Sequence, residues 1–181
     1  MSARTLLGAL TIAALLAACS SDPVGPLGSG GVQGTQCSLA RLGVPVTMGI
    51  YELHDTGKST VTVKAVTLPG AHGLAMTKAW LVPIGQTGDG STMDVGAGWP
   101  YPPSFTKLVR AVWAQRQPAV GATIKPGQDL NLVFGLTRTK GSVGKSDGPA
   151  ITYTAAGSTY TVQEETGLVL AAANCQAQPS S

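Results

Sequence analysis

The sequence is poor in charged residues and has no cluster of titratable side chains. Only 12% of its 181 residues are Asp, Glu, Lys or Arg, and it has two histidines. Acid–base catalysis needs at least one titratable group held in place with a suitable pKa. No group of neighbouring Asp, Glu and His residues meets this need, so the sequence favours a non-enzymatic protein, and we expect no cofactor.

The chain also lacks the basic stripe that nucleic-acid-binding proteins use. Its 12 Lys and Arg residues only slightly outnumber nine acidic ones and are spread along the chain. One loose group consists of Arg138, Lys140 and Lys145. It gives little support for an anionic partner, and we expect no nucleic-acid binding.

The N-terminal hydrophobic run is too short to cross a bilayer. It extends over Leu6–Leu16 after the Met1 amine and Arg4, and the polar run Ser20–Pro23 ends it. A spanning helix needs about 20 apolar residues. A charged start, a short apolar segment and small residues before Cys19 are instead typical of a secretory signal.

The last residues of this segment, Leu16-Ala17-Ala18-Cys19, resemble the lipobox of bacterial lipoproteins. The resemblance implies that residues 1–18 are removed as a signal peptide and that the Cys19 thiol carries a diacylglycerol. Burial of an acyl chain in the bilayer contributes about 0.8 kcal/mol of membrane-binding free energy per CH₂ group. They would hold the protein at the extracytoplasmic face of the cell membrane, and in a two-membrane host Ser20 would direct it to the outer membrane. The alternative is a secreted protein whose signal ends in cysteine by chance.

Cysteine is scarce, and the two remaining cysteines form an even pair. Cys37 and Cys175 lie at the two ends of the expected folded region. An oxidising compartment favours a disulfide between them. In the chain-entropy model a loop of this length stabilises the fold by about 4–5 kcal/mol. Two free thiols or a metal pair are the alternative.

Composition divides the mature chain into three parts. Residues 19–36 hold the lipidated cysteine and a stretch rich in Gly, Pro and Ser, which predicts a flexible tether. Residues 37–175 are long enough for one domain with a core. Residues 176–181 are polar and predict a disordered tail.

The domain shows a repeated pattern of strand, turn and strand. Val44–Leu53 and Thr60–Leu68 flank the turn residues Asp55-Thr56-Gly57-Lys58, which predicts a hairpin. Asp129–Arg138 follows a Pro-Gly turn and alternates most clearly between apolar and other residues. Further strands are expected at Lys78–Ile84, 151–154, 159–162 and Leu168–Ala172, with a hairpin between the middle two and a short helix near 105–115. This pattern predicts an all-β sandwich of about seven strands.

Two of these segments carry a family resemblance. Thr60–Leu68 after the Asp-Thr-Gly-Lys-Ser turn, together with the Pro126-Gly127 turn before Leu130–Leu136, resembles immunoglobulin-like domains of bacterial surface proteins. With the lipobox and the Gly-rich stretch, the chain is similar to uncharacterised actinobacterial lipoproteins. The resemblance implies an immunoglobulin-like β-sandwich and no known activity.

The best candidate for a binding surface is a Pro-rich segment that contains Trp99 and Tyr101. Aromatic side chains held at low entropic cost make good recognition anchors. The alternative is that both rings fold back over one end of the sandwich. Trp80 and Trp113 lie in apolar stretches and are expected in the core.

Two further patterns suggest chemistry. His54 and His72, with Met48, Met76 and Met93, offer donors that suit copper, although their spacing matches no metal motif and solvent-facing histidines are the alternative. Ser146 lies in a Gly-x-Ser-x-Gly sequence, but no helix is expected after it, as a hydrolase nucleophile would need.

These observations predict a non-enzymatic, lipid-anchored binding or structural module of the cell envelope. Its partners would be the membrane, through the lipid, and a protein or cell-wall component. The alternative is a copper-binding protein or a hydrolase that uses His54, His72 or Ser146.

Overall fold

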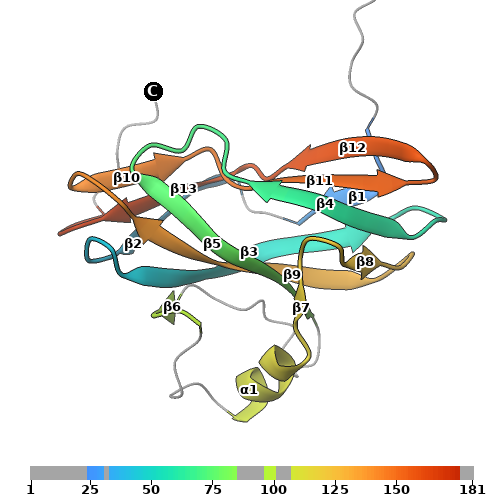
Figure 1. Cartoon of the computed structure of the whole chain (residues 1–181), viewed down its shortest axis with the longest axis horizontal. Coiled ribbons are helices and arrows are strands. Elements are labelled where there is room, and N and C mark those ends of the chain that lie inside the picture. Colours follow the sequence, from blue (N-terminus) through green and yellow to red (C-terminus); the bar gives the residue numbers. More distant parts are fainter. Residues whose placement is uncertain (1–23, 31–32, 85–95, 101–106, 176–181) are drawn as a thin grey trace, which may run out of the picture.

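The computed structural model describes residues 24–30, 33–84, 96–100 and 107–175. They form an all-β sandwich with one short helix, which confirms the predicted fold class (Figure 1). Thirteen strands are present in these ranges against about seven predicted, because several are only two to four residues long.

One layer of the sandwich is a single six-stranded sheet. Its order is β1-β3-β9-β5-β7, with β6 added beside β3, and all its pairings are antiparallel. Its strands are β1 (Leu27–Ser29), β3 (Pro45–Asp55), β5 (Leu74–Pro83), β6 (Gly96–Ala97), β7 (Gln117–Pro118) and β9 (Asp129–Arg138).

The facing layer consists of two smaller sheets side by side. One has the order β10-β13-β2, in which β13 and β2 are parallel, and the other has the order β12-β11-β4-β8. Their strands are β2 (Gly34–Leu39), β4 (Val61–Thr67), β8 (Thr123–Ile124), β10 (Val143–Ser146), β11 (Ala150–Ala155), β12 (Ser158–Gln163) and β13 (Thr166–Ala171). Both sheets contribute to one core with the first layer, for example through Ile151 and Leu168.

Strand β9 is the centre of the molecule. The predicted alternation is confirmed, since Leu130, Leu132, Phe134 and Leu136 all face the main core. The residues between them are buried as well. They are covered on the other side because the helix α1 (Lys107–Ala114) and its flanking segments lie on the outer face of the sheet (Figure 1). No helix in the described ranges is long and apolar enough to cross a membrane.

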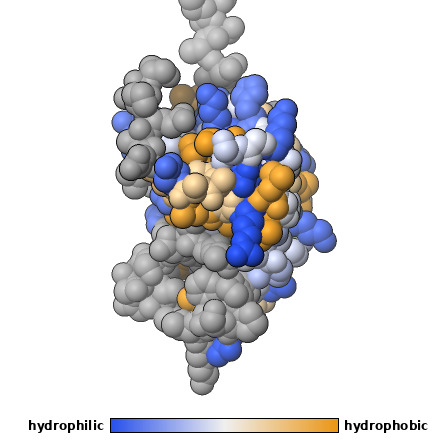
Figure 2. Space-filling model, turned by 90° about the vertical axis from the view of Figure 1, so that its left-hand side faces the viewer, coloured by the Kyte–Doolittle hydropathy of each residue, from blue (hydrophilic) through white to orange (hydrophobic). Residues whose placement is uncertain are grey.

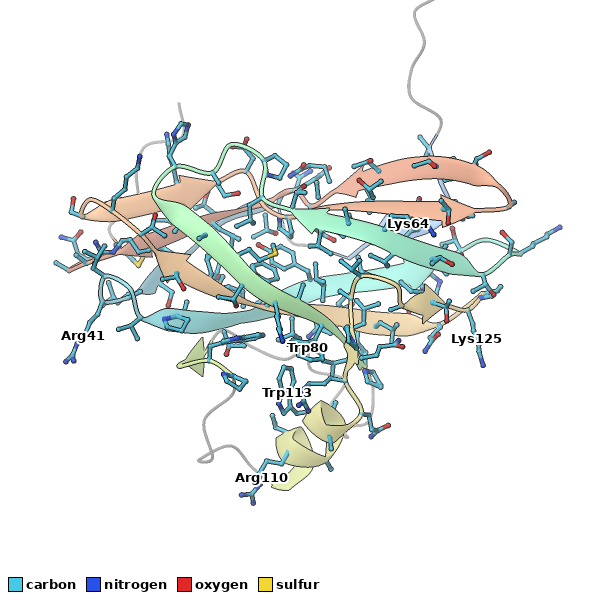
Figure 3. The ribbon with its side chains drawn as sticks, in the orientation of Figure 1. Arg41, Lys64, Trp80, Arg110, Trp113 and Lys125 are labelled. Atoms are coloured by element: carbon cyan, nitrogen blue, oxygen red, sulfur yellow. A yellow bond between two sulfur atoms is a disulfide. The ribbon has the colours of Figure 1, made fainter. Side chains whose placement is uncertain are left out.

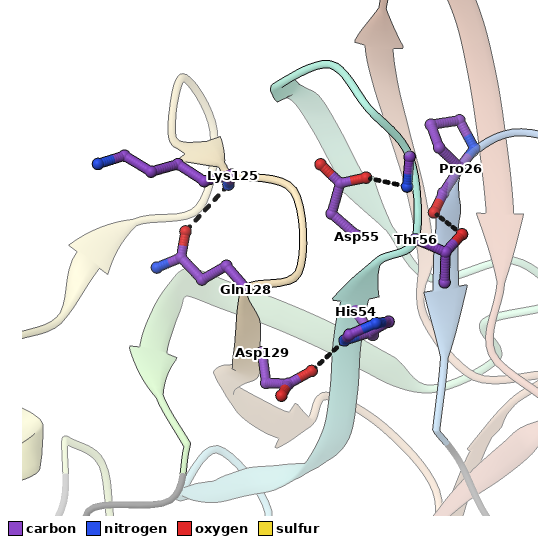
Figure 4. A network of polar contacts seen from close by, with 8 residues as sticks. Pro26, His54, Asp55, Thr56, Lys125, Gln128 and Asp129 are labelled. Atoms are coloured by element: carbon purple, nitrogen blue, oxygen red, sulfur yellow. Dashed lines mark hydrogen bonds and ion pairs between the residues drawn. The ribbon is translucent and has the colours of Figure 1, made fainter.

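The predicted hairpin between residues 44–53 and 60–68 is wrong. Strand β3 pairs with β9, β1 and β6, and strand β4 belongs to the facing layer. Within the turn, Asp55 Oδ1 accepts a hydrogen bond from Gly57 N at 2.8 Å (Figure 4). The turn is also bonded to other segments instead of closing a hairpin, since the Thr56 hydroxyl donates to Pro26 O at 2.8 Å (Figure 4). The Asp55 carbonyl also accepts from Gly127 N at 2.8 Å. The turn therefore carries the chain from one layer to the other.

The predicted flexible tether at 19–36 is wrong for its second half. Residues Leu27–Ser29 form β1 on the edge of the first layer, and β2 begins at Gly34. The reason is the Leu27 side chain, which is buried in the main core while its backbone N–H donates to the Tyr153 hydroxyl at 3.1 Å. One well-placed apolar residue thus outweighs the polar composition around it. The segment nearest Cys19 lies outside the described residues, as does the predicted tail at 176–181.

The predicted disulfide is present. Cys37 and Cys175 are bonded, with a Cα–Cα distance of 5.7 Å and a sequence separation of 138. The bond links the edge strand β2 to the segment that follows β13.

The two sheets of the second layer meet at a seam where β10 passes into β11 and β12 passes into β13. Gly148 adopts a φ of 99° at this seam, where a Cβ would lie 2.6 Å from Thr166 O and 2.8 Å from Glu164 O. Glu164 is fully buried here. Burial raises the pKa of Glu164 to about 7, the Ser29 side chain opposes this rise, and the Glu165 charge adds to it.

Glu164→Gln tests the effect of this buried carboxyl on stability. Because the folded-state pKa of about 7 lies above the ordinary value of 4.5, the folded protein retains a proton that the unfolded chain has lost between these values. The stability of the wild type should therefore fall as pH rises from about 4.5 to 7. We expect the variant to lose this dependence and to be more stable than the wild type at pH 8 by about 2 kcal/mol.

Urea unfolding at pH 5 and pH 8 measures the difference. Glu165→Gln, at the exposed neighbouring position, is the matched control and should keep most of the wild-type pH dependence, because burial is the larger cause of the raised pKa and the Glu165 charge only adds to it. Equal pH dependence in the wild type and Glu164→Gln would contradict the assignment.

Candidate functional site

All three tryptophans of the chain meet on the outer face of the first layer. Trp113 of α1 lies edge-on to Trp80 of β5, with ring centroids 6.3 Å apart, and edge-on to Trp99 at 6.0 Å. Figure 3 shows Trp80 and Trp113 between the sheet and the helix. The Arg116 guanidinium lies over both rings, 4.7 Å from the Trp113 centroid and 5.1 Å from that of Trp80. We call these four residues the tryptophan cluster.

The helix positions Trp113 through its apolar spacing. Val112 and Trp113 come three and four residues after Val109, so all three lie on one face of a helix. This face packs on Val82 and Val133 of the sheet, forming a second, smaller core. The predicted short helix is confirmed. Trp113 packs against this second core rather than the main one, and the half-buried Trp80 lies beside it through its edge-on contact with the Trp113 ring.

Trp99 is held against the sheet by its own segment. The Thr47 hydroxyl donates to Gly98 O at 2.7 Å, and Gly96–Ala97 pairs with β3. Gly135 of β9 leaves room for the ring, since a Cβ there would lie 2.7 Å from a Trp99 ring carbon. Of the two readings of this segment, the structure therefore supports the second for Trp99, whose ring folds back on the sandwich. Tyr101 lies outside the described residues.

An open apolar groove adjoins the tryptophan cluster and shares Trp80 with it. It lies between β5 and β7 of the first layer and β4 of the facing layer, and its volume is about 370 Å³. We call it the Trp80 groove. Its apolar lining consists of Val66, Met76, Ala79, Trp80, Pro118 and Val120.

The Trp80 groove has few polar lining residues, and the one charge among them is positive. Thr77 and Lys78 are its polar lining residues, and none of its lining residues is acidic. Val120 remains 59% exposed at the groove, so a large apolar side chain faces solvent there. The groove is suited to an apolar group with a neighbouring negative charge that could approach Lys78.

The structure separates the two histidines proposed for copper. His54 pairs with Asp129 at the start of β9 (Figure 4), while His72 precedes Leu74, which pairs with Arg138 at the other end of that strand. At about 3.3 Å per residue, the ends of β9 are roughly 30 Å apart. The histidines cannot share a metal ion. Within the described residues, no group of three or more His, Cys, Asp or Glu side chains could hold a metal ion.

The methionines and Ser146 have structural roles instead. Met48 is fully buried in the main core, Met76 lines the groove, and Met93 lies outside the described residues. The Ser146 hydroxyl donates to Pro69 O at 2.8 Å, and the chain continues into the strand β11 rather than a helix. Ser146 therefore lacks the strand-to-helix turn on which a hydrolase nucleophile of this motif depends.

The basic residues Arg138, Lys140 and Lys145 do not form one basic surface patch. Arg138 is buried, and its guanidinium donates to Ala40 O at 3.0 Å and to Gly141 O. Lys140 and Lys145 remain exposed. Arg138 thus serves to hold two loops to the end of β9.

A second groove, of about 380 Å³, lies between β2 and β3. Its lining includes Ile50, Glu52 and Thr166, and much of the rest belongs to the segment around residues 30–36. Residues 31 and 32 of that segment lie outside the described ranges. The Trp80 groove, whose lining is described throughout, is the better defined candidate site.

Sequence reasoning missed the Trp80 groove. Its lining comes from β4, β5 and the segment around β7, which are distant in the chain. The one available signal was Val120, an apolar residue two positions after Pro118 and directly before Gly121. Such a residue has no partner that a local pattern can identify.

Comparisons with known proteins add no functional information. No protein-family model and no curated protein matches the chain. Vibrio cholerae VesB protease aligns over 81% of this chain and 32% of its own, with 9% identity and a TM-score of 0.40. The ASH/PapD-like domain of human CEP192 (PapD-like domain 7) aligns over 97% and 99%, with 11% identity and a TM-score of 0.37. The chain thus spans about a third of the protease, and both scores are too low to support an argument about activity.

Gly135→Ala tests how Trp99 is held. The added methyl group would lie against the Thr77 hydroxyl and the Trp99 ring and would displace these side chains or the strand. Overpacking of this kind costs about 1–3 kcal/mol. We expect the free energy of unfolding in urea to fall by that amount and the near-UV circular dichroism of the tryptophans to change.

The matched control is Gly28→Ala in β1, where a Cβ would lie at an ordinary 3.7 Å from its nearest neighbour. We expect it to change stability by no more than about 0.5 kcal/mol. A Gly135→Ala protein with wild-type stability and an unchanged tryptophan spectrum would contradict the packing described for Trp99.

Proposed function

We propose that the protein is a lipid-anchored binding module of the bacterial cell envelope that acts without catalysis and binds its partner in the Trp80 groove. The observation that carries the proposal is the groove itself, an open apolar surface beside a rigid aromatic cluster. Exposed apolar surface rimmed by polar residues is typical of interaction sites. The lipobox resemblance at residues 16–19 supports the anchor.

The chemistry of the groove favours a protein partner over a cell-wall glycan. Sugar recognition relies on several well-placed hydrogen-bonding groups, whereas this lining is mainly aliphatic and aromatic. Lys78 supplies the positive charge at the rim. We therefore propose that the partner presents an apolar side chain followed closely by an acidic one.

The tryptophan cluster would give this site its rigidity. Trp80 contributes to both the groove and the cluster, and Arg116 covers its ring beside Trp113. A preorganised wall loses little conformational entropy on binding. The partner would then meet a surface that is already formed.

The anchor is tested by Cys19→Ser in the full chain. We expect the wild-type protein to fractionate with membranes and to incorporate radiolabelled palmitate in a bacterial host. The variant should lose the label completely and be recovered mainly outside the membrane fraction, because the acyl chains have no attachment site. An unmodified residue 19 in the wild type, shown by intact-mass analysis, would contradict the proposed anchor.

The groove is tested by placing a photo-crosslinking amino acid in cells at position 118, an exposed lining position that leaves Lys78 in place. We expect a discrete adduct whose yield falls at least fivefold when Val120 is changed to Asp, since a carboxylate in the groove repels the acidic partner and is costly to bury. The crosslinker at Thr159, exposed on β12, is the control and should give no such adduct. An adduct from position 118 that survives Val120→Asp, or no adduct there, would overturn the groove as the binding site.

A further inference from the structure

The end of the sandwich farthest from β1 carries a second exposed apolar surface, which we call the apolar tip. Its exposed fractions are 55% for Leu39, 57% for Leu42, 45% for Val44 and 41% for Val143. Figure 2 shows this end of the molecule, where hydrophobic surface gathers next to strongly hydrophilic side chains.

Backbone pairing brings these residues together from two parts of the chain. Leu39 of β2 and Val143 of β10 both lie opposite Ala171 of the central strand β13, so they flank it in one row across the sheet. The loop after β2 is tied to the same place, since Ala40 N donates to Ala171 O and Gly43 N donates to Arg138 O, each at 2.9 Å. The apolar tip is therefore a surface with a defined backbone.

The charge around the apolar tip is positive. Arg41 and Lys140 are exposed in the loops that form it, and Figure 3 shows Arg41 pointing outward. The buried Arg138 guanidinium lies behind them and contacts only backbone carbonyls in the bonds described above. The acidic residues of the described ranges lie at the opposite half of the first layer or at the seam: Glu52, Asp55, Asp129, Asp147, Glu164 and Glu165.

We propose that the apolar tip inserts into the interface of an anionic phospholipid bilayer. Aliphatic side chains next to Arg and Lys suit such an interface, where the apolar groups enter the acyl boundary and the cations meet the headgroups. A soluble ligand would need a concave site, and the apolar tip is made of projecting loop and strand-end residues. Charge complementarity thus selects a negatively charged lipid surface as the occupant.

The position of the proposed anchor places this surface within reach of the same membrane, a step that rests on the proposed function. Cys19 is eight residues before the buried Leu27, so the chain between them spans at most about 28 Å. Leu27 lies opposite Asp55 at one end of β3. The apolar tip lies beside the other end of that strand, at Pro45, about 33 Å away. With both ends in contact, the sandwich would lie along the bilayer.

The test uses residues 19–181 with Cys19→Ser, so that no lipid contributes. Co-sedimentation is measured with vesicles of phosphatidylglycerol and phosphatidylcholine in equal parts and with vesicles of phosphatidylcholine alone. We expect binding to the anionic vesicles that is at least fivefold stronger than to the neutral ones. Leu42→Asp and Arg41→Glu should each weaken it at least fivefold.

Two matched controls separate a specific surface from a general effect. Val120→Asp introduces the same charge at an equally exposed apolar residue outside the apolar tip, and Lys125→Glu reverses a charge at the far end of the sandwich. Both should bind vesicles as the unmodified sequence does. Near-UV circular dichroism confirms that each variant is folded.

Three results would overturn the proposal: no binding to anionic vesicles, binding that Leu42→Asp leaves unchanged, or equal losses in the controls. If the apolar tip captured an acidic protein and bound no vesicles, the proposal would also be overturned, because the partner of this surface would be a protein and not a membrane. The outcome is independent of acylation and of the Trp80 groove, so failure here leaves the proposed function standing. Failure of the crosslinking experiment, in turn, leaves vesicle binding intact.

Discussion

The burial of β9 on both of its faces is the constraint on which the rest of the structure depends. One face supplies four large apolar side chains to the main core, which both sheets of the facing layer cover. The other face would expose Val133 and the buried Asn131 if α1 and the Trp99 segment did not cover it. A strand buried on both faces needs a third layer, and in this small sandwich a single two-turn helix and one aromatic cluster provide it.

The surface features follow from this arrangement. Because the third layer covers only part of the first sheet, it ends at Trp80, and the groove opens where the two main layers diverge beside β5. At the far end, Arg138 terminates β9 and holds the loops from which the apolar tip projects. The Trp80 groove thus lies along β5, which pairs with β9, and the apolar tip lies beyond the end of β9 itself.

The elements with a local signal could be predicted from the sequence. Alternation identified β9, and spacing of three and four residues identified α1. The turn around Gly157 identified the hairpin of β11 and β12. Partners could not be predicted in the same way: β3 pairs with β9 because the Asp55 turn bonds to Pro26 and Gly127, both distant in sequence. β1 depends on the hydrogen bond between Leu27 and Tyr153, and the groove forms where Val120 and Trp80 line the same surface; no local window contains either pair.

The parallel pair of β2 and β13 sets the order in which the domain can be completed. Its two strands come from opposite ends of the folded region, so among the described strand pairings this one has the greatest sequence separation. Contacts of this kind form slowly, because a long loop must close before they contribute. If the chain is exported with its N-terminus first, as proposed, β2 would stay unpaired and the Cys37 thiol free until β13 and Cys175 emerge. Assembly of this sheet, and the oxidation that seals it, would therefore be the final events of maturation.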